Sequence, residues 1–88
     1  MAENGGDYTL QEWEDLCAIY DNRCLCCGRG DLLLTVDHII PLIDGGSNNI
    51  SNIQPLCKSC NSSKHIKHTD YHQRWVDMTG GEPELVNN

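Results

Sequence analysis

Two pairs of cysteines, each with two intervening residues, are the strongest chemical signal in the chain: Cys24 with Cys27, and Cys57 with Cys60. Each pair can present two thiolates from a tight turn, and two pairs complete the tetrahedral ligand set of a structural zinc ion. A site of this kind contributes roughly 10–16 kcal/mol of apparent binding free energy at neutral pH. The spacing therefore predicts a zinc ion that stabilises the fold of a small chain.

The spacing of these cysteines is also compatible with two other uses. A redox dithiol has the same Cys-x-x-Cys spacing but needs only one pair, and a rubredoxin-like iron site has the same four thiolates as zinc. The 29 residues between Cys27 and Cys57 exceed the roughly 15–20 of a simple zinc ribbon, which indicates an insertion between the pairs. Of the two spare cysteines, Cys17 is expected in the core and Cys26 in the loop of the first pair.

The insertion and the residues that follow it contain the parts of a second site. Asp37 and His38 are adjacent, and amide side chains follow at Asn52 and Asn61. Carboxylate and amide oxygens suit a hard cation such as Mg²⁺ or Mn²⁺, and an imidazole can take a proton from water near neutral pH. A lone His after an apolar run is more often structural than catalytic, but these companions indicate a cation site beside a proton acceptor.

The elements that must position these residues follow from the apolar pattern and the turn residues. Thr9 and Glu12 have the spacing of a capping box at a helix start, and residues 44–49 form the strongest loop signal in the chain. The pattern predicts an α+β domain with three helices and two short strands. The helices are expected at 10–20, at 58–67 and from a cap at Thr69 or Asp70 to 78, and the strands at 32–36 and 53–56.

The charges divide the chain into three parts. It has 6 Lys and Arg against 13 Asp and Glu, a formal net charge of −7, yet all six basic residues lie within 23–74 with only four acids. The total excludes a uniformly basic nucleic-acid coat and a polybasic membrane-binding face. We expect an acidic segment with one helix at 1–22, one domain at 23–78 and a flexible tail at 79–88.

The expected compartment and partners depend on two kinds of segment, a signal peptide and a membrane-spanning apolar run. The first residues lack the pattern of a signal peptide, and no run approaches 18 apolar residues. We therefore expect a cytoplasmic protein with reduced thiols and no membrane partner. The oligomeric state stays open, with a monomer as one possibility.

Five motifs, taken in order over about residues 24–70, resemble those of the HNH endonuclease family, in its subgroup with a four-cysteine zinc knuckle. The motifs are Cys-x-x-Cys-Gly, Val-Asp-His-Ile-x-Pro, Gly-Gly, Asn-x-Gln-x-Leu-Cys-x-x-Cys-Asn and a following Lys. The resemblance implies a small ββα-metal (His-Me finger) core, stabilised by the four-cysteine zinc site and flanked by helices at both ends.

The resemblance also implies a role for each residue of the second site. His38 would be the general base that activates water, and Asp37 a ligand of the catalytic Mg²⁺ or Mn²⁺. Asn52 would hold the two-stranded loop and the histidine in register. Asn61 stands where the family often has a third-letter His, so the chain has a His-Asn-Asn variant in which the amide oxygen would be the second metal ligand.

The implied function is metal-dependent cutting or nicking of DNA phosphodiester bonds with little sequence specificity, leaving a 5′ phosphate and a 3′ hydroxyl. Lys64, Lys67 and His65 would contact substrate phosphate; His65 could instead be a metal ligand or a solvated side chain. Because few cations are available, we expect weak and strongly salt-dependent binding. Two alternatives are a noncatalytic zinc module that binds nucleic acid or a protein partner, and a rubredoxin-like electron carrier.

Overall fold

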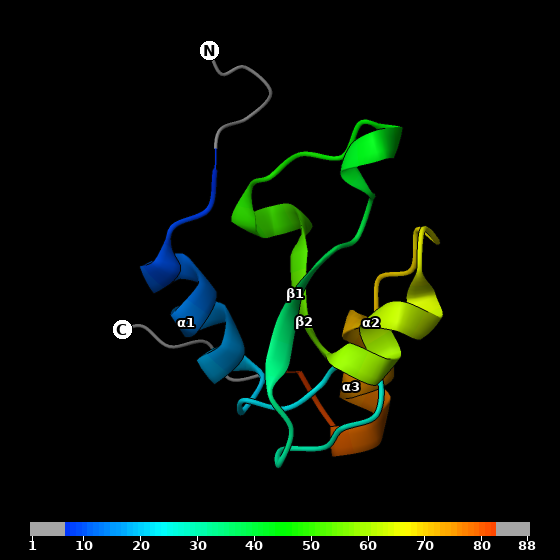
Figure 1. Cartoon of the computed structure of the whole chain (residues 1–88). Helices are drawn as coiled ribbons and strands as arrows, with labels where there is room; N and C mark the ends of the chain where they lie inside the picture. Colours follow the sequence, from blue (N-terminus) through cyan, green and yellow to red (C-terminus); the bar gives the residue numbers. More distant parts are fainter. Residues whose placement is uncertain (1–6, 83–88) are drawn as a thin grey trace.

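The computed structural model describes residues 7–82. Within this range the chain forms a two-stranded antiparallel sheet flanked by three α-helices (Figure 1). The elements are α1 (Leu10–Ile19), β1 (Leu34–His38), β2 (Ile53–Cys57), α2 (Lys58–Lys64) and α3 (His72–Thr79), with 3-10 turns η1 (Leu42–Asp44) and η2 (Ile50–Asn52) between the strands. The β1–β2–α2 unit is a ββα arrangement, so the predicted α+β fold class is confirmed.

Helix α1 begins at the predicted capping box. The Thr9 side chain accepts a hydrogen bond from the Glu12 backbone at 3.0 Å, and the Glu12 carboxylate accepts one from the Thr9 backbone at 2.9 Å. The helix ends at Ile19 because Asp21 and Asn22 both have a left-handed backbone, with φ of 59° and 55°. Its buried residue is Cys17, as expected from the sequence. Helix α1 lies on the opposite side of the β1–β2 hairpin from α2 (Figure 1).

Strand β1 lies two residues later than predicted, at 34–38 instead of 32–36. Its register pairs Leu34 with Cys57 and Asp37 with Gln54, and every residue of β2 is buried. The strand that begins at Leu34 therefore aligns with the part of β2 that enters the core, while Leu33 is 86% exposed before the strand starts. As a result Asp37 and His38 are the last two residues of β1, whereas the predicted strand ends before them.

Helix α2 is shorter than predicted. It ends at Lys64 and not at 67, because His65 has a positive φ of 55° and a non-glycine residue in this region terminates a helix. The predicted helix at 58–67 would have included His65, but His65 lies immediately after the observed helix. Helix α3 starts at His72, later than predicted, and the Asp70 carboxylate accepts a hydrogen bond from the His72 backbone at 2.9 Å.

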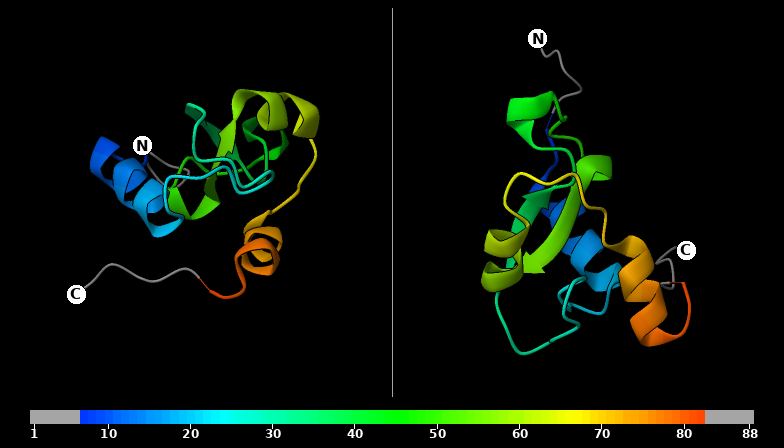
Figure 2. Two further views of the ribbon diagram at one scale, coloured as in Figure 1. Left: turned by 90° about the horizontal axis from the view of Figure 1, so that it is seen from below. Right: turned by 90° about the vertical axis from the view of Figure 1, so that its right-hand side faces the viewer.

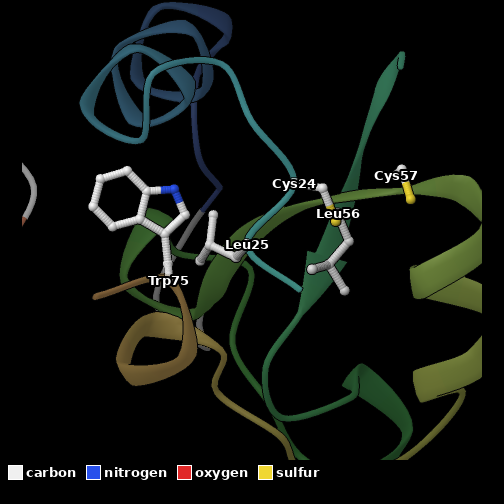
Figure 3. Close-up of a cluster of buried hydrophobic side chains, with 5 residues drawn as sticks. All are labelled: Cys24, Leu25, Leu56, Cys57 and Trp75. Atoms are coloured by element: carbon white, nitrogen blue, oxygen red, sulfur yellow. The ribbon is translucent and has the colours of Figure 1, made fainter. Parts of the chain in front are cut away.

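The core is small and includes two of the predicted zinc ligands. One buried cluster forms between β2, α3 and the loop that carries Cys24 and Cys27, here called the cysteine loop; its members are Cys24, Leu25, Leu56, Cys57 and Trp75 (Figure 3). Tyr20 at the end of α1 contacts Trp75 edge to face, with 5.1 Å between ring centroids, and its hydroxyl lies 2.6 Å from His72 Nδ1. Tyr20 thereby connects the end of α1 to α3, and both lie toward the same end of the two-stranded sheet (Figure 2).

The predicted domain limits at 22/23 and 78/79 stay a prediction. Helix α1 contacts β2 and η2, and α3 reaches Thr79. Of the predicted flexible tail at 79–88, residues 83–88 lie outside the described residues, as do residues 1–6 of the acidic segment. Within residues 7–82, no helix has the length and apolar character needed to cross a membrane.

Candidate active site and metal centre

The two cysteine pairs come together as a single potential metal centre. The Sγ atoms of Cys24, Cys27, Cys57 and Cys60 all lie within 4.8 Å of one another, and those of Cys27 and Cys57 are 3.9 Å apart. Four sulfur atoms at this spacing fit the tetrahedral thiolate set of zinc. Among the side chains that the structure describes, these are the one group of three or more His, Cys, Asp or Glu close enough to share an ion.

Local structure explains how each pair is presented. Gly28 closes the first turn with its N–H donating to the Cys24 carbonyl at 2.8 Å and a left-handed φ of 77°, a conformation that favours glycine. Cys57 ends β2 and caps α2, and Cys60 lies in the first turn of that helix. A metal bound here would join the cysteine loop, the strand and the helix.

Hydrogen bonding and burial give the thiols different acidities. Burial raises the pKa of Cys24, but hydrogen bonds from the backbone N–H groups of Cys27, Cys57 and Cys26 outweigh it and lower the pKa to about 7. Burial and hydrogen bonds with neighbouring thiols raise the pKa of Cys60, and burial raises that of Cys27. Four thiolates this close together repel one another, so full ionisation of the cluster requires a bound cation.

A cleft of about 240 Å³ lies between the end of β1, η1 and the end of α2. It brings together four predicted site residues, namely Asp37, His38, Asn61 and His65. The remaining wall comes from Val36, Pro41, Leu42 and Ile43. The exposed His65, the residue immediately after α2, is part of this lining. Lys67 is exposed and is not part of the wall.

Asn52 is buried outside the cleft and closes the loop that forms one wall of it. Its side-chain nitrogen donates to the carbonyls of Ile40 and Ser47 at 2.9 and 2.8 Å, and its oxygen accepts from the Ile40 N–H at 3.0 Å. Gly46 lies so close to this loop that a Cβ there would be 1.8 Å from the Ile40 carbonyl oxygen. The Gly-Gly motif and Asn52 therefore belong to one tightly closed turn.

Asn61 connects α2 to β1. Its Nδ2 donates to Thr35 Oγ1 at 2.9 Å and to the Val36 carbonyl at 3.1 Å. This orientation directs the amide nitrogen toward the strand and leaves the amide oxygen as the atom available to a ligand. The amide therefore fits the predicted ligand role and also fixes the helix against the strand.

The position of Lys64 differs from the one predicted for a phosphate contact. Its side chain is buried, and Nζ lies 3.2 Å from Asp37 Oδ2 and donates to the His38 carbonyl at 3.0 Å. The physical reason is that Lys64 lies three residues after Asn61, on the face of α2 that packs against β1, where a carboxylate and a carbonyl replace its hydration. The prediction that Lys64 meets substrate at the surface is therefore corrected.

Two residues of the site environment have contacts that the sequence did not predict. Gln54 lies opposite Asp37 and donates to its Oδ2 at 2.8 Å, and Asn48 Oδ1 lies 2.7 Å from His38 Nε2. A polar side chain within the apolar run 53–57 was an available signal for Gln54, since strand alternation places cross-strand partners on one face. Asn48 lies within the loop predicted at 44–49, and no spacing rule predicts its contact with His38.

Comparisons of the sequence with known proteins match the part of the chain that contains these residues. The family model described as HNH endonuclease matches residues 24–67, half of the 88 residues. A protein of Bacillus subtilis (strain 168) named "SPbeta prophage-derived putative HNH endonuclease YoqL" is 34% identical over 64 residues, covering 61% of this chain and 28% of that protein. Anaredoxin of Nostoc sp. (strain PCC 7120) is 35% identical over 51 residues, covering 58% of each chain.

The chain thus spans little more than a quarter of the first relative and less than two thirds of the second. The part that matches the family model contains both cysteine pairs, the Asp-His pair and both asparagines of the proposed site. On this match and on its ββα arrangement, the chain belongs to the HNH endonuclease family.

Proposed function

We propose that this chain hydrolyses phosphodiester bonds of DNA in the cleft beside His38, with Mg²⁺ or Mn²⁺ as the catalytic ion and zinc at the four cysteines. The observation that carries the proposal is the meeting of Asp37, His38 and Asn61 in one cleft. These side chains come from a strand and from the helix that follows the second cysteine pair. We propose residues 23–78 as the nuclease domain and a cytoplasmic setting for the protein.

His38 is the proposed general base. Its ring is half-buried in the wall of the cleft, and the contact from Nε2 to Asn48 restricts its orientation. In this position the imidazole would take a proton from the water that attacks phosphorus, a step that contributes typically 10²–10⁴-fold in rate. The attack would release the 3′ oxygen and leave phosphate on the 5′ side.

Asp37 and Asn61 are the proposed ligands of the divalent ion. One carboxylate oxygen of Asp37 already contacts Lys64 and Gln54, so the other oxygen and the Asn61 amide oxygen are the atoms left for a ligand. Hard oxygen donors of this kind suit Mg²⁺ and Mn²⁺, which keep several waters and accept phosphate oxygens as further ligands. When bound, such an ion offsets the negative charge that develops on the phosphate oxygens.

DNA binding would depend on few cations. With Lys64 buried, the exposed Lys67 and His65 are the proposed phosphate contacts beside the cleft. The net charge of −7 opposes association with DNA at long range. Binding should therefore be weak, strongly dependent on salt and largely independent of base sequence.

The test is relaxation of supercoiled plasmid by purified protein in a panel of divalent ions, with zinc content measured separately. His38→Ala should keep zinc and fold and lose roughly 10²-fold or more in cleavage rate. His68→Ala is the control for loss of an imidazole outside the cleft: His68 is exposed and does not line the cleft, and its ring contacts Asp44 Oδ2 at 2.9 Å. Equal cleavage by parent and His38→Ala would reject His38 as the base.

The alternatives give different results in the same preparation. A noncatalytic zinc module would bind nucleic acid or a protein partner without cleavage in any of the ions. A rubredoxin-like carrier would hold iron at the four thiolates, and iron at such a site is coloured whereas zinc is not. Metal analysis and an absorbance spectrum of the purified protein therefore accompany the plasmid assay.

A further inference from the structure

The segment that precedes α1 reaches the loop that carries His38's hydrogen-bond partner. Asp7 and Asn48 form an isolated parallel bridge, and the Tyr8 N–H donates to the Asn48 carbonyl at 2.9 Å. The side chains continue this contact: Asn48 Nδ2 donates to Asp7 Oδ1 at 2.8 Å, and Asn48 Oδ1 lies 2.7 Å from His38 Nε2. A carboxylate, an amide and an imidazole are thus connected in series.

The chemistry of these three groups fixes the direction of each hydrogen bond. An ionised carboxylate only accepts, so Asp7 selects the NH₂ side of the Asn48 amide. The opposite side of that amide, Oδ1, also only accepts, so His38 Nε2 must be the donor. A neutral imidazole carries one N–H. With the proton at Nε2, the lone pair is at Nδ1.

We propose that Asn48, oriented by Asp7, is a positioning residue that holds His38 as the Nε2–H tautomer and leaves Nδ1 to take the proton from water. The inference rests on the proposed function of His38 as the general base. It also gives a role to Asp7, which precedes α1. Asp7 lies 41 residues from Asn48 in sequence and outside the stretch that matches the family model.

Reversing the charge at Asp7 is the direct test. In Asp7→Lys an ammonium faces the Asn48 amide, which should turn its oxygen toward the lysine and its NH₂ toward His38. Nε2 must then accept, and the proton moves to Nδ1. Cleavage should fall roughly 10- to 100-fold, the range typical of losing a partner that orients a functional histidine, while zinc content and circular dichroism stay unchanged.

The tautomer itself can be read without DNA or a catalytic ion. Long-range ¹H–¹⁵N spectra of the zinc-loaded full chain at about pH 8, above the usual range for imidazole, distinguish a protonated from an unprotonated ring nitrogen. The parent should show His38 protonated at Nε2, and Asp7→Lys should show the proton at Nδ1. An Nδ1–H signal in the parent, or an Nε2–H signal retained in Asp7→Lys, would overturn the proposal even if His38→Ala is inactive.

Two further variants separate this role from simpler explanations. Glu14→Lys makes the same charge change on the exposed face of α1, away from the His38 contacts, and should keep the parent tautomer and at least the parent rate. The double exchange Asp7→Asn with Asn48→Asp places a carboxylate at position 48 and an amide at position 7. The carboxylate can accept both from His38 Nε2 and from the amide NH₂ at position 7, so the Nε2–H tautomer should remain. Loss of that tautomer in the exchanged protein would also contradict the proposal.

Discussion

The ammonium of Lys64 lies 3.2 Å from the carboxylate of Asp37, and the two side chains are 0% and 6% exposed. The same ammonium donates to the His38 carbonyl, so one buried cation holds both adjacent residues of the proposed site. Gln54 shares the Asp37 oxygen at 2.8 Å and accepts from the Tyr71 N–H at 2.9 Å. The network connects the end of α2, the hairpin and the segment that leads into α3.

Lys64→Met should therefore destabilise the protein and not simply weaken substrate binding. Removing one partner of a buried ion pair leaves the other charge without compensation and typically costs about 3–5 kcal/mol. Urea unfolding of the zinc-loaded protein measures this change. Lys67→Met is the control: Lys67 is exposed, so stability should stay within about 0.5 kcal/mol, while DNA binding weakens and its salt dependence decreases. Equal free energies of unfolding for the parent and Lys64→Met would show that the Lys64 ammonium does not stabilise the fold.

Zinc removal should unfold the site. Cys57 is buried, ends β2 and belongs to both the core cluster and the four-sulfur centre, so Cys57→Ser should lose zinc and most of the cooperative unfolding transition. Cys26→Ser is the matched control, since Cys26 lies in the same loop as Cys24 and is not part of the four-sulfur group. Metal analysis and thermal melting test both variants. A zinc-free Cys57→Ser protein with the parent melting curve would contradict a structural role for the metal.

Asn61→Ala should raise the concentration of Mg²⁺ or Mn²⁺ needed for half-maximal cleavage, because it removes one proposed oxygen ligand. It also removes the hydrogen bonds to Thr35 and Val36, at a cost of roughly 0.5–1.5 kcal/mol each. Ser62→Ala, at an exposed neighbouring position of α2, should leave both properties unchanged. A metal titration identical to that of the parent would remove Asn61 from the ligand set, whatever the change in stability.

Cys17 should react slowly with thiol reagents. It is 6% exposed, and burial together with the neighbouring Glu14 carboxylate raises its pKa to about 11. The thiolate is the reactive form, so at pH 8 only about one molecule in a thousand carries it even before access is considered. Mass spectrometry after iodoacetamide treatment of zinc-loaded Cys26→Ser protein measures the rate, with denatured protein as the fast reference. Labelling of the folded protein at the denatured rate would show that α1 opens readily.

The sequence and the structure agree on the parts whose signals are local. The capping box at Thr9 and Glu12 depends on residues three apart, and each cysteine pair depends on a single turn. The motifs also indicated the family and the association of Asp37, His38 and Asn61, which the structure places in one cleft. The roles assigned to these three residues remain predictions until the variants are measured.

What the sequence determined by itself is the chemistry that can be assembled: four thiolates for one metal, and a carboxylate, an imidazole and amides within one domain. Only the tertiary structure decided where several of those groups lie. Lys64 and Asp37 are 27 residues apart, and Asp7 and Asn48 are 41 apart. Burial of an ammonium and selection of a hydrogen-bond partner depend on which distant segments meet, and residue type and local spacing do not contain that information.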